Sequence, residues 1–169
     1  NGMFGITVNL PPNIPATPLI IGNKSAFLPD APALTADNTS NDVEHDIVVT
    51  FTDDATWRAA VTGVSVNGTP LNIADYTLAD GTLTLKPSAG NALLTTSGEK
   101  QVTISASGYN DATVIQPVFA GALNLTNTTV SFSPALSPGT TTSCTITALD
   151  QFNNAVQGYV FKADVTITD

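Results

Sequence analysis

Residues 75–86 read Asp-Tyr-Thr-Leu-Ala-Asp-Gly-Thr-Leu-Thr-Leu-Lys, and this stretch decides the fold. Leu83 and Leu85 alternate with polar residues, which is the period of a strand that has one buried face. Asp80-Gly81 stands between the two strand-like halves. Such a pair favours a tight turn, because glycine tolerates a positive φ. Residues 75–86 therefore predict a β-hairpin.

The same signals recur on both sides of this hairpin. Apolar residues alternate at three further places: Ile47, Val49 and Phe51; Val64 and Val66; Val102, Ile104 and Ala106. A second turn pair, Asn67-Gly68, follows Val66. Short strands at this spacing predict an all-β protein built from immunoglobulin-like β-sandwich modules. Short helical turns are expected near residues 54–60, where Asp54 is a candidate cap, and within 88–95.

The composition argues against several classes of partner. Charged residues make up 11% of the chain, and 14 acidic against 5 basic residues give a net charge of −9. This balance repels phosphate groups, so we expect no nucleic acid partner and no docking on anionic lipid. No apolar run approaches the ~20 residues that span a bilayer, so membrane insertion is not expected either.

Several motifs within residues 33–118 resemble one known family. They are Phe51-Thr52-Asp53-Asp54 with Trp57-Arg58, Val64-Ser65-Val66-Asn67-Gly68, Asp75-Tyr76-Thr77, and Ser107-Gly108-Tyr109-Asn110-Asp111-Ala112. This pattern is similar to the haemoglobin-interacting domain family. The resemblance implies a small β-sandwich that is repeated in long bacterial surface proteins. Only a few members are assigned haemoglobin binding, and most copies lie beside surface-layer, adhesin or polysaccharide-associated modules.

Three parts are expected along the chain. Residues 1–30 form an N-terminal strand and a proline-rich connector, and residues 31–118 form the sandwich that resembles the haemoglobin-interacting domain. Residues 119–169 resemble the opening strands of bacterial immunoglobulin-like domains, as a partial or strand-complemented module with strands expected at 123–126, 129–132, 140–149 and 159–168. Cys144, within the third of these, is expected to be a small buried hydrophobe.

The N-terminal strand raises the question of what it pairs with. Ile6, Val8 and Leu10 share one face of residues 5–10, and Pro11-Pro12 ends the run. These three residues are candidates for completing the open sheet of a neighbouring copy by strand addition. Two alternatives stay open: an exit strand of a preceding domain, or pairing within the same chain.

The sequence has few residues that could act together as a nucleophile and a base, so we do not expect this protein to be an enzyme. His45 is the only histidine and no Gly-x-Ser-x-Gly turn is present, which leaves no candidate nucleophile with its base. Adjacent acids such as Asp53-Asp54 are better explained as helix caps. No cofactor is expected, and haem lacks an evident axial ligand. Calcium remains an option at four acids of one loop, Asp37, Asp42, Glu44 and Asp46, the alternative being a plain solvated loop.

These observations predict a non-catalytic protein of the bacterial cell surface, outside the cell. The main expectation is a structural or assembly component of a surface layer, an adhesin stalk or an extracellular filament, with copies of itself or neighbouring modules as partners. One alternative is a module that recognises haemoglobin or a polysaccharide through loops near Trp57 or Tyr109. For Trp57 a core role is the favoured interpretation, because in the family pattern it lies where a helical turn covers the sandwich. A further alternative is an accessory module of a larger extracellular enzyme.

Overall fold

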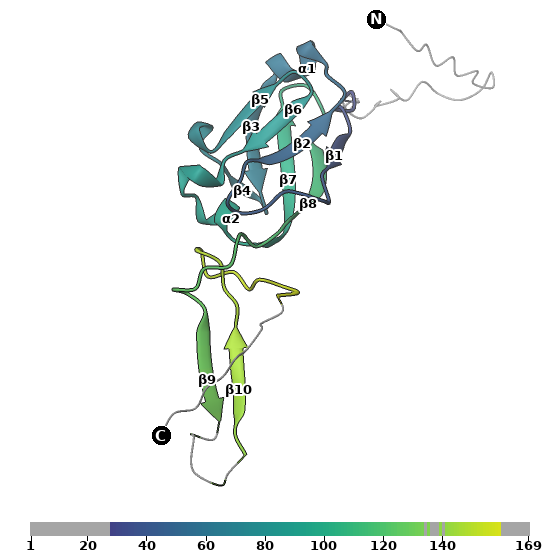
Figure 1. Cartoon of the computed structure of the whole chain (residues 1–169). Coiled ribbons are helices and arrows are strands. Elements are labelled where there is room, and N and C mark those ends of the chain that lie inside the picture. The colour runs from purple at the N-terminus through teal and green to yellow at the C-terminus, as the bar shows by residue number, and fades with distance from the viewer. Residues whose placement is uncertain (1–27, 134, 136–138, 140, 160–169) are drawn as a thin grey trace, which may run out of the picture.

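A sandwich of two antiparallel sheets dominates the structure (Figure 1). The computed structural model describes residues 28–133, 135, 139 and 141–159. The first sheet has the order β1 (Leu34–Ala36), β2 (Ile47–Phe51), β6 (Thr82–Leu85), β5 (Tyr76–Ala79). The second has the order β4 (Thr69–Pro70), β3 (Val61–Val66), β7 (Gly98–Ala106), β8 (Ala112–Val118). The predicted all-β fold is confirmed.

Both predicted turns connect strands. In the β5–β6 hairpin Ala79 pairs with Thr82, and Gly81 has a φ of 70°. Asn67 and Gly68 both have positive φ, 51° and 77°, and link β3 to β4. Two successive left-handed residues match the twist of the strands, and asparagine and glycine adopt this conformation at low cost.

The predicted apolar faces meet in the space between the sheets. All of these residues are buried in one cluster: Ile47, Val49, Phe51, Val64, Val66, Leu83, Leu85, Val102, Ile104 and Ala106. Each contributes because alternate residues of a strand point to the same side. The hydrophobic effect of this layer, about 25 cal/mol for each Å² of apolar surface buried, is the main stabilising term.

Short helical turns close the sandwich ends. The helix α1 (Ala55–Ala59) begins after Asp54, whose carboxylate accepts hydrogen bonds from the backbone N–H groups of Thr56 (2.8 Å) and Trp57 (3.0 Å). The expected turn at 54–60 and its cap are therefore both present. The other helical turns are η1 (Ile73–Asp75), η2 (Pro87–Ala89) and α2 (Ala92–Thr95). α2 falls within the expected region 88–95, and η2 overlaps its start.

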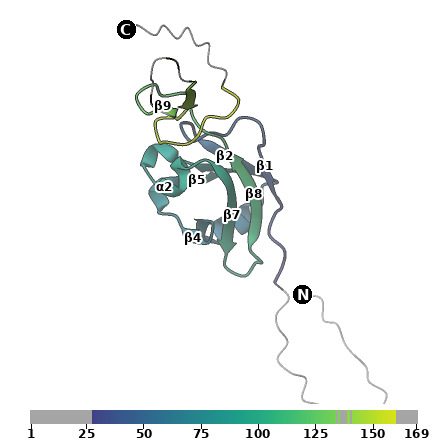
Figure 2. The same ribbon diagram turned by 90° about the horizontal axis from the view of Figure 1, so that it is seen from below.

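One side of the sandwich is closed by a buried glutamine. β1 and β8 lie side by side there, although they belong to different sheets (Figures 1 and 2). The Gln116 side chain accepts the N–H of Asp37 (3.0 Å) and donates to its carbonyl (2.6 Å). Further along, Phe119 donates its N–H to the Asn41 carbonyl (2.9 Å) and accepts from Val43 (3.1 Å). Side-chain and backbone bonds thus replace a strand ladder between the sheets.

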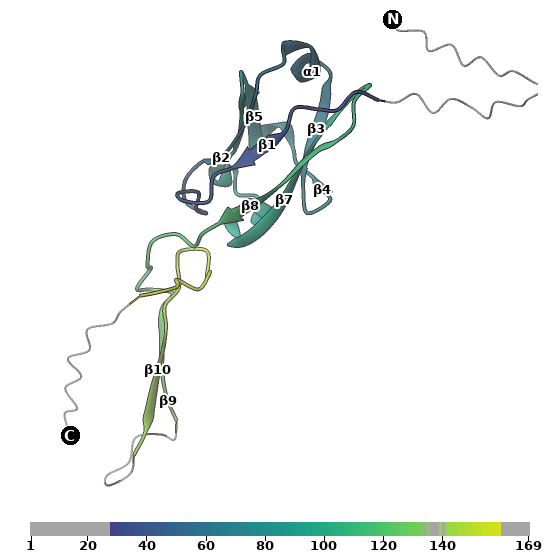
Figure 3. The ribbon, with the colours of Figure 1, turned by 90° about the vertical axis from the view of Figure 1, so that its right-hand side faces the viewer.

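Residues after the sandwich form a separate two-stranded antiparallel sheet of β9 (Thr129–Ser133) and β10 (Ser143–Thr147) (Figure 3). The strand expected at 123–126 is wrong: Asn124 accepts the N–H groups of Thr126 and Asn127 and makes a turn. Cys144 is exposed, not buried, because within the described residues no other sheet covers β9 and β10. Most of the strand expected at 159–168 lies outside the described residues.

Replacement of Gln116 by methionine tests the closed side. The side chains are similar in size, but methionine leaves the N–H and carbonyl of Asp37 without their buried partner. We expect a loss of about 1–3 kcal/mol in the free energy of unfolding, measured by urea denaturation with Trp57 fluorescence. Gln101→Met, at an exposed position of β7, is the control and should change stability by less than about 0.5 kcal/mol. Equal effects of the two substitutions would contradict the assigned role.

Candidate functional site

Four segments that are far apart in the sequence gather at one end of the sandwich. This α1 end consists of residues 28–32, 52–60, 80–81 and 107–111. Backbone hydrogen bonds connect them: Phe51 donates to Gly81 (2.9 Å), Ser107 to Ala60 (2.8 Å) and Asn110 to Pro29 (3.0 Å). The α1 end is remote from the β9–β10 sheet (Figures 1 and 3). Loops held in this way on a rigid scaffold commonly carry binding function.

Arg58 organises the charges of this end. Its Nε and Nη2 donate to the two carboxylate oxygens of Asp53 at 3.0 and 3.3 Å, and its Nη1 lies 2.7 Å from Oδ1 of Asp80. Asp53 also accepts the N–H of Gly81 (3.1 Å). Because these groups are partly or fully exposed, the ion pairs contribute little to stability. Their effect is to fix the β5–β6 turn against α1.

The two aromatic candidates of the sequence analysis lie at the α1 end, but they differ in exposure. Trp57 is fully buried and packs edge-on against Phe51, with ring centroids 5.2 Å apart. Its Nε1–H has no hydrogen-bond partner in the described chain. Trp57 is therefore a core residue, and its ring is not a direct ligand contact. Tyr109 is half-buried against the core, so part of its ring is accessible in the β7–β8 turn.

A shallow acidic pocket opens beside α1. It has a volume of about 540 Å³ and is lined by Asp30, Ala31, Pro32, Thr52, Asp53 and Asp54. Its ionisable groups are carboxylates, and the exposed acids Asp80 and Asp111 belong to the same end. Such a surface accepts hydrogen bonds and suits a cationic or N–H-rich group of a partner.

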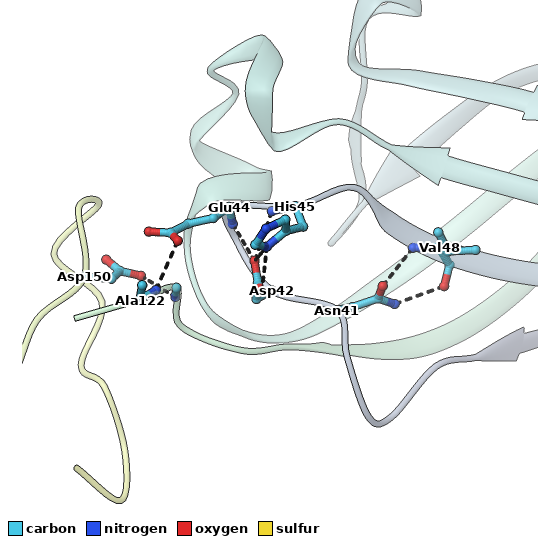
Figure 4. Close-up of polar contacts among 8 residues, drawn as sticks. Asn41, Asp42, Glu44, His45, Val48, Ala122 and Asp150 are labelled. Atoms are coloured by element: carbon cyan, nitrogen blue, oxygen red, sulfur yellow. Dashed lines mark hydrogen bonds and ion pairs between the residues drawn. The ribbon is translucent and has the colours of Figure 1, made fainter. Parts of the chain in front are cut away.

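The candidate calcium residues lie at the opposite end, and two of them are engaged in their own loop. Asp37 accepts the N–H and Oγ1 of Thr39 (2.8 and 2.6 Å) and the Oγ of Ser40 (2.6 Å). The side-chain bonds from Ser40 and Thr39 are the main reason that the pKa of Asp37 is lowered to about 2. Asp42 accepts the N–H groups of Glu44 and His45, and the His45 Nδ1–H at 2.9 Å (Figure 4).

The other two candidate calcium residues, Glu44 and Asp46, differ in their surroundings. Glu44 accepts the N–H of Ala122 (3.1 Å) and so binds the sandwich to the following segment, whereas Asp46 is exposed. Among the residues that the structure describes, no three His, Cys, Asp or Glu side chains gather closely enough to hold a metal ion. Calcium binding at these four residues stays a prediction.

Asp150 is a buried hub that the sequence analysis missed. Its carboxylate accepts the N–H groups of Gly121 (2.9 Å), Phe152 (2.8 Å) and Asn154 (2.8 Å) and the Asn154 amide (2.8 Å). Burial by itself would raise the pKa of Asp150, but the hydrogen bonds from Asn154, Gly121 and Phe152 outweigh burial and lower it. Asn154 also accepts from Ser97 (2.8 Å) and donates to Thr95 (2.9 Å). The two Asn154 bonds, to Ser97 and Thr95, attach the residues after 119 to the sandwich.

The strand-complementation candidates Ile6, Val8 and Leu10 lie outside the described residues. Nothing in the structure therefore tests their pairing. In the described part of the chain, no helix is long and apolar enough to cross a membrane.

Comparison with known proteins identifies one matching family. A family model described as "Heme-binding protein Shr-like, Hb-interacting domain" matches residues 34–119. The chain belongs to this family. The matched region of this Hb-interacting domain begins with β1 and ends just after β8, so it is the whole sandwich. The resemblance noted from the sequence motifs is confirmed. No curated protein and no solved structure matches the chain.

Titration of His45 tests the geometry of the loop. The hydrogen bond to Asp42 is the main cause that raises the pKa of His45 above 6.5. Its contribution to stability is therefore present at acid pH and lost as the pH rises through the raised pKa. We expect NMR titration of the single histidine to give a raised pKa, which Asp42→Asn brings back towards 6.5 and the control Asp46→Asn does not. A pKa that is insensitive to Asp42→Asn would be inconsistent with the contact.

Asp150→Ala tests the hub. The change removes the acceptor of three backbone N–H groups, so we expect the amides of Gly121, Phe152 and Asn154 to exchange hydrogen about ten-fold faster or more. The measurement is hydrogen exchange followed by NMR at neutral pH. The core amides of Val102 and Ile104 serve as internal controls. If the three amides keep their protection, Asp150 does not hold the junction.

Proposed function

We propose that this Hb-interacting domain is a protein-recognition module at the surface of a bacterial cell, and that its ligand is haemoglobin. The observation that carries this proposal is the family match over residues 34–119. Because the match covers the whole sandwich and stops just after β8, the binding capacity is assigned to the sandwich and not to the β9–β10 sheet.

The α1 end supports this function better than the opposite end does. The opposite end is occupied by the segment that comes after the sandwich, through Glu44, Thr95 and Ser97. The α1 end instead presents four loops, the partly exposed Tyr109 and the acidic pocket. Tyrosine is enriched in protein-binding surfaces, and polar groups commonly form their rim. Lysine, arginine or histidine groups on the globin surface would complement its carboxylates.

The proposed ligand is the globin surface and not the haem iron. His45, the only histidine of the chain, is exposed, bound to Asp42 and remote from the α1 end. A haem ligand needs an apolar pocket around it, which an exposed loop side chain does not have. Binding should therefore be compared for haemoglobin, haem-free globin and free haem. We expect the two protein ligands to bind and free haem not to bind.

Other functions remain predictions from the sequence. They are a structural role in a surface layer, stalk or filament, recognition of a polysaccharide, and service as an accessory module of an extracellular enzyme. A glycan panel tested beside haemoglobin separates the second of these from the proposal. Glycan binding without haemoglobin binding would replace haemoglobin as the ligand.

A matched pair of charge reversals locates the binding surface. Asp111→Lys and Asp46→Lys both change an exposed acid, but only Asp111 lies at the α1 end. We expect Asp111→Lys to raise the Kd for haemoglobin about ten-fold, mostly through a slower association rate, because a carboxylate that attracts basic groups becomes repulsive. Asp46→Lys should change the Kd less than about two-fold. Biolayer interferometry with the full chain provides the measurement. If Asp46→Lys weakens binding as much as Asp111→Lys, the α1 end is not the interface.

A further inference from the structure

The two sides of the sandwich differ in how their strand edges are covered. On the side of β1 and β8, Gln116 and the contacts of Phe119 join the sheets. On the other side, β5 has only β6 as a neighbour among the described strands. β4 pairs only with Ser65 and Val66, so within the described chain no strand accompanies residues 61–63 of β3 on that side. The sandwich therefore has one closed and one open side.

The open side carries an apolar groove along the free edge of β5. The groove has a volume of about 390 Å³ and is lined by Arg58, Val61, Ile73, Tyr76, Thr77 and Leu78. Ile73 leaves 80% of its surface exposed, and it belongs to the turn η1 that leads directly into β5. Arg58 is the charged residue of the lining, and Asp53 and Asp80 already bind it. The groove thus offers apolar contact beside unpaired backbone groups.

The edge lacks the usual protection against strand addition. β5 reads Tyr-Thr-Leu-Ala, without proline, lysine or another charged residue. Natural proteins commonly place such residues on free edges, because unpaired N–H and C=O groups bind other strands. An unprotected edge with an adjacent apolar groove is suited to an extended, uncharged segment that has apolar residues at alternate positions.

The chain contains a segment of this chemistry outside the described residues. Residues 5–10 read Gly-Ile-Thr-Val-Asn-Leu, without charge or proline. Ile6, Val8 and Leu10 alternate with Thr7 and Asn9, so one face is apolar and the other polar. We propose that residues 5–10 of a second copy add to β5 as a further strand and place their apolar side chains in the groove.

The connector explains why the strand comes from a second copy. Leu28 is held at the α1 end, where its carbonyl accepts from the Asn110 side chain (3.3 Å). Residues 11–27 span roughly 50 to 60 Å when extended. Prolines at positions 11, 12, 15 and 18 favour an extended connector, which supports pairing with a neighbouring copy over pairing with the same sandwich. The reach is sufficient to connect neighbouring copies.

Self-association and haemoglobin binding should respond in opposite ways to salt concentration. Each copy has a net charge of −9, so two copies repel each other at low ionic strength. The proposed contact is apolar and gains from screening, whereas an interaction through the carboxylates of the α1 end weakens with salt. Assembly therefore strengthens as salt is added, and the two proposals fail or succeed independently.

Analytical ultracentrifugation of four proteins tests the proposal: the full chain, a version lacking residues 1–12, and the full chain with Ile73→Glu or Ile115→Glu. Ile115 is an exposed isoleucine (49%) on β8, at the closed side, and is the matched control for Ile73. We expect the full chain and Ile115→Glu to self-associate equally. The truncated chain and Ile73→Glu should associate at least ten-fold more weakly, and both should keep their haemoglobin affinity.

A synthetic peptide of residues 5–10 provides the second measurement. It should bind the truncated chain and bind at least ten-fold more weakly when Ile73→Glu is added. A full chain that stays monomeric at all concentrations overturns the proposal, and so does a truncated chain that associates as strongly as the full chain. If the peptide binds but the full chain stays monomeric, residues 5–10 cover their own sandwich and the role of a second copy is refuted.

Discussion

The apolar layer between the two sheets is the constraint on which the rest of the structure depends. Every strand of the sandwich that is long enough to alternate contributes buried side chains to this layer, and Trp57 closes it at one end. Because the layer fixes which face of each strand points inward, it also fixes where the turns emerge. The loops of the α1 end are brought together only as a consequence of this packing.

Buried polar side chains provide hydrogen-bond partners for backbone groups that the apolar layer leaves unpaired. Gln116 is fully buried, and it compensates for the missing ladder between β1 and β8 by binding both backbone groups of Asp37. Asp150 is equally buried and gathers N–H groups of the segment after the sandwich. Both arrangements satisfy groups that would be costly to leave unpaired away from water. Gln116 therefore closes one side of the sandwich, and Asn154, which Asp150 holds in place, attaches the residues after 119 through its bonds to Ser97 and Thr95.

These arrangements leave two surfaces of different character. The α1 end is acidic and made of loops, which suits recognition of a protein with basic groups. The free edge of β5 is uncharged and partly apolar, which suits an added strand. The family match spans residues 34–119, so it includes β5 as well as most of the α1 end and does not by itself decide between the two surfaces. A surface protein that uses both could bind a ligand while it is joined to its neighbours.

The sequence by itself determined the elements. Within the sandwich, period-two alternation, the turn pairs Asn67-Gly68 and Asp80-Gly81 and the cap Asp54 predicted the central strands, the hairpins and α1 correctly, because these signals act between near neighbours in the chain. Only the tertiary structure decided which edge is open, that Trp57 is core, that Cys144 is exposed and that Asp150 is a hub. Burial and hydrogen bonding of these residues depend on partners up to tens of positions away, and local periodicity does not contain that information.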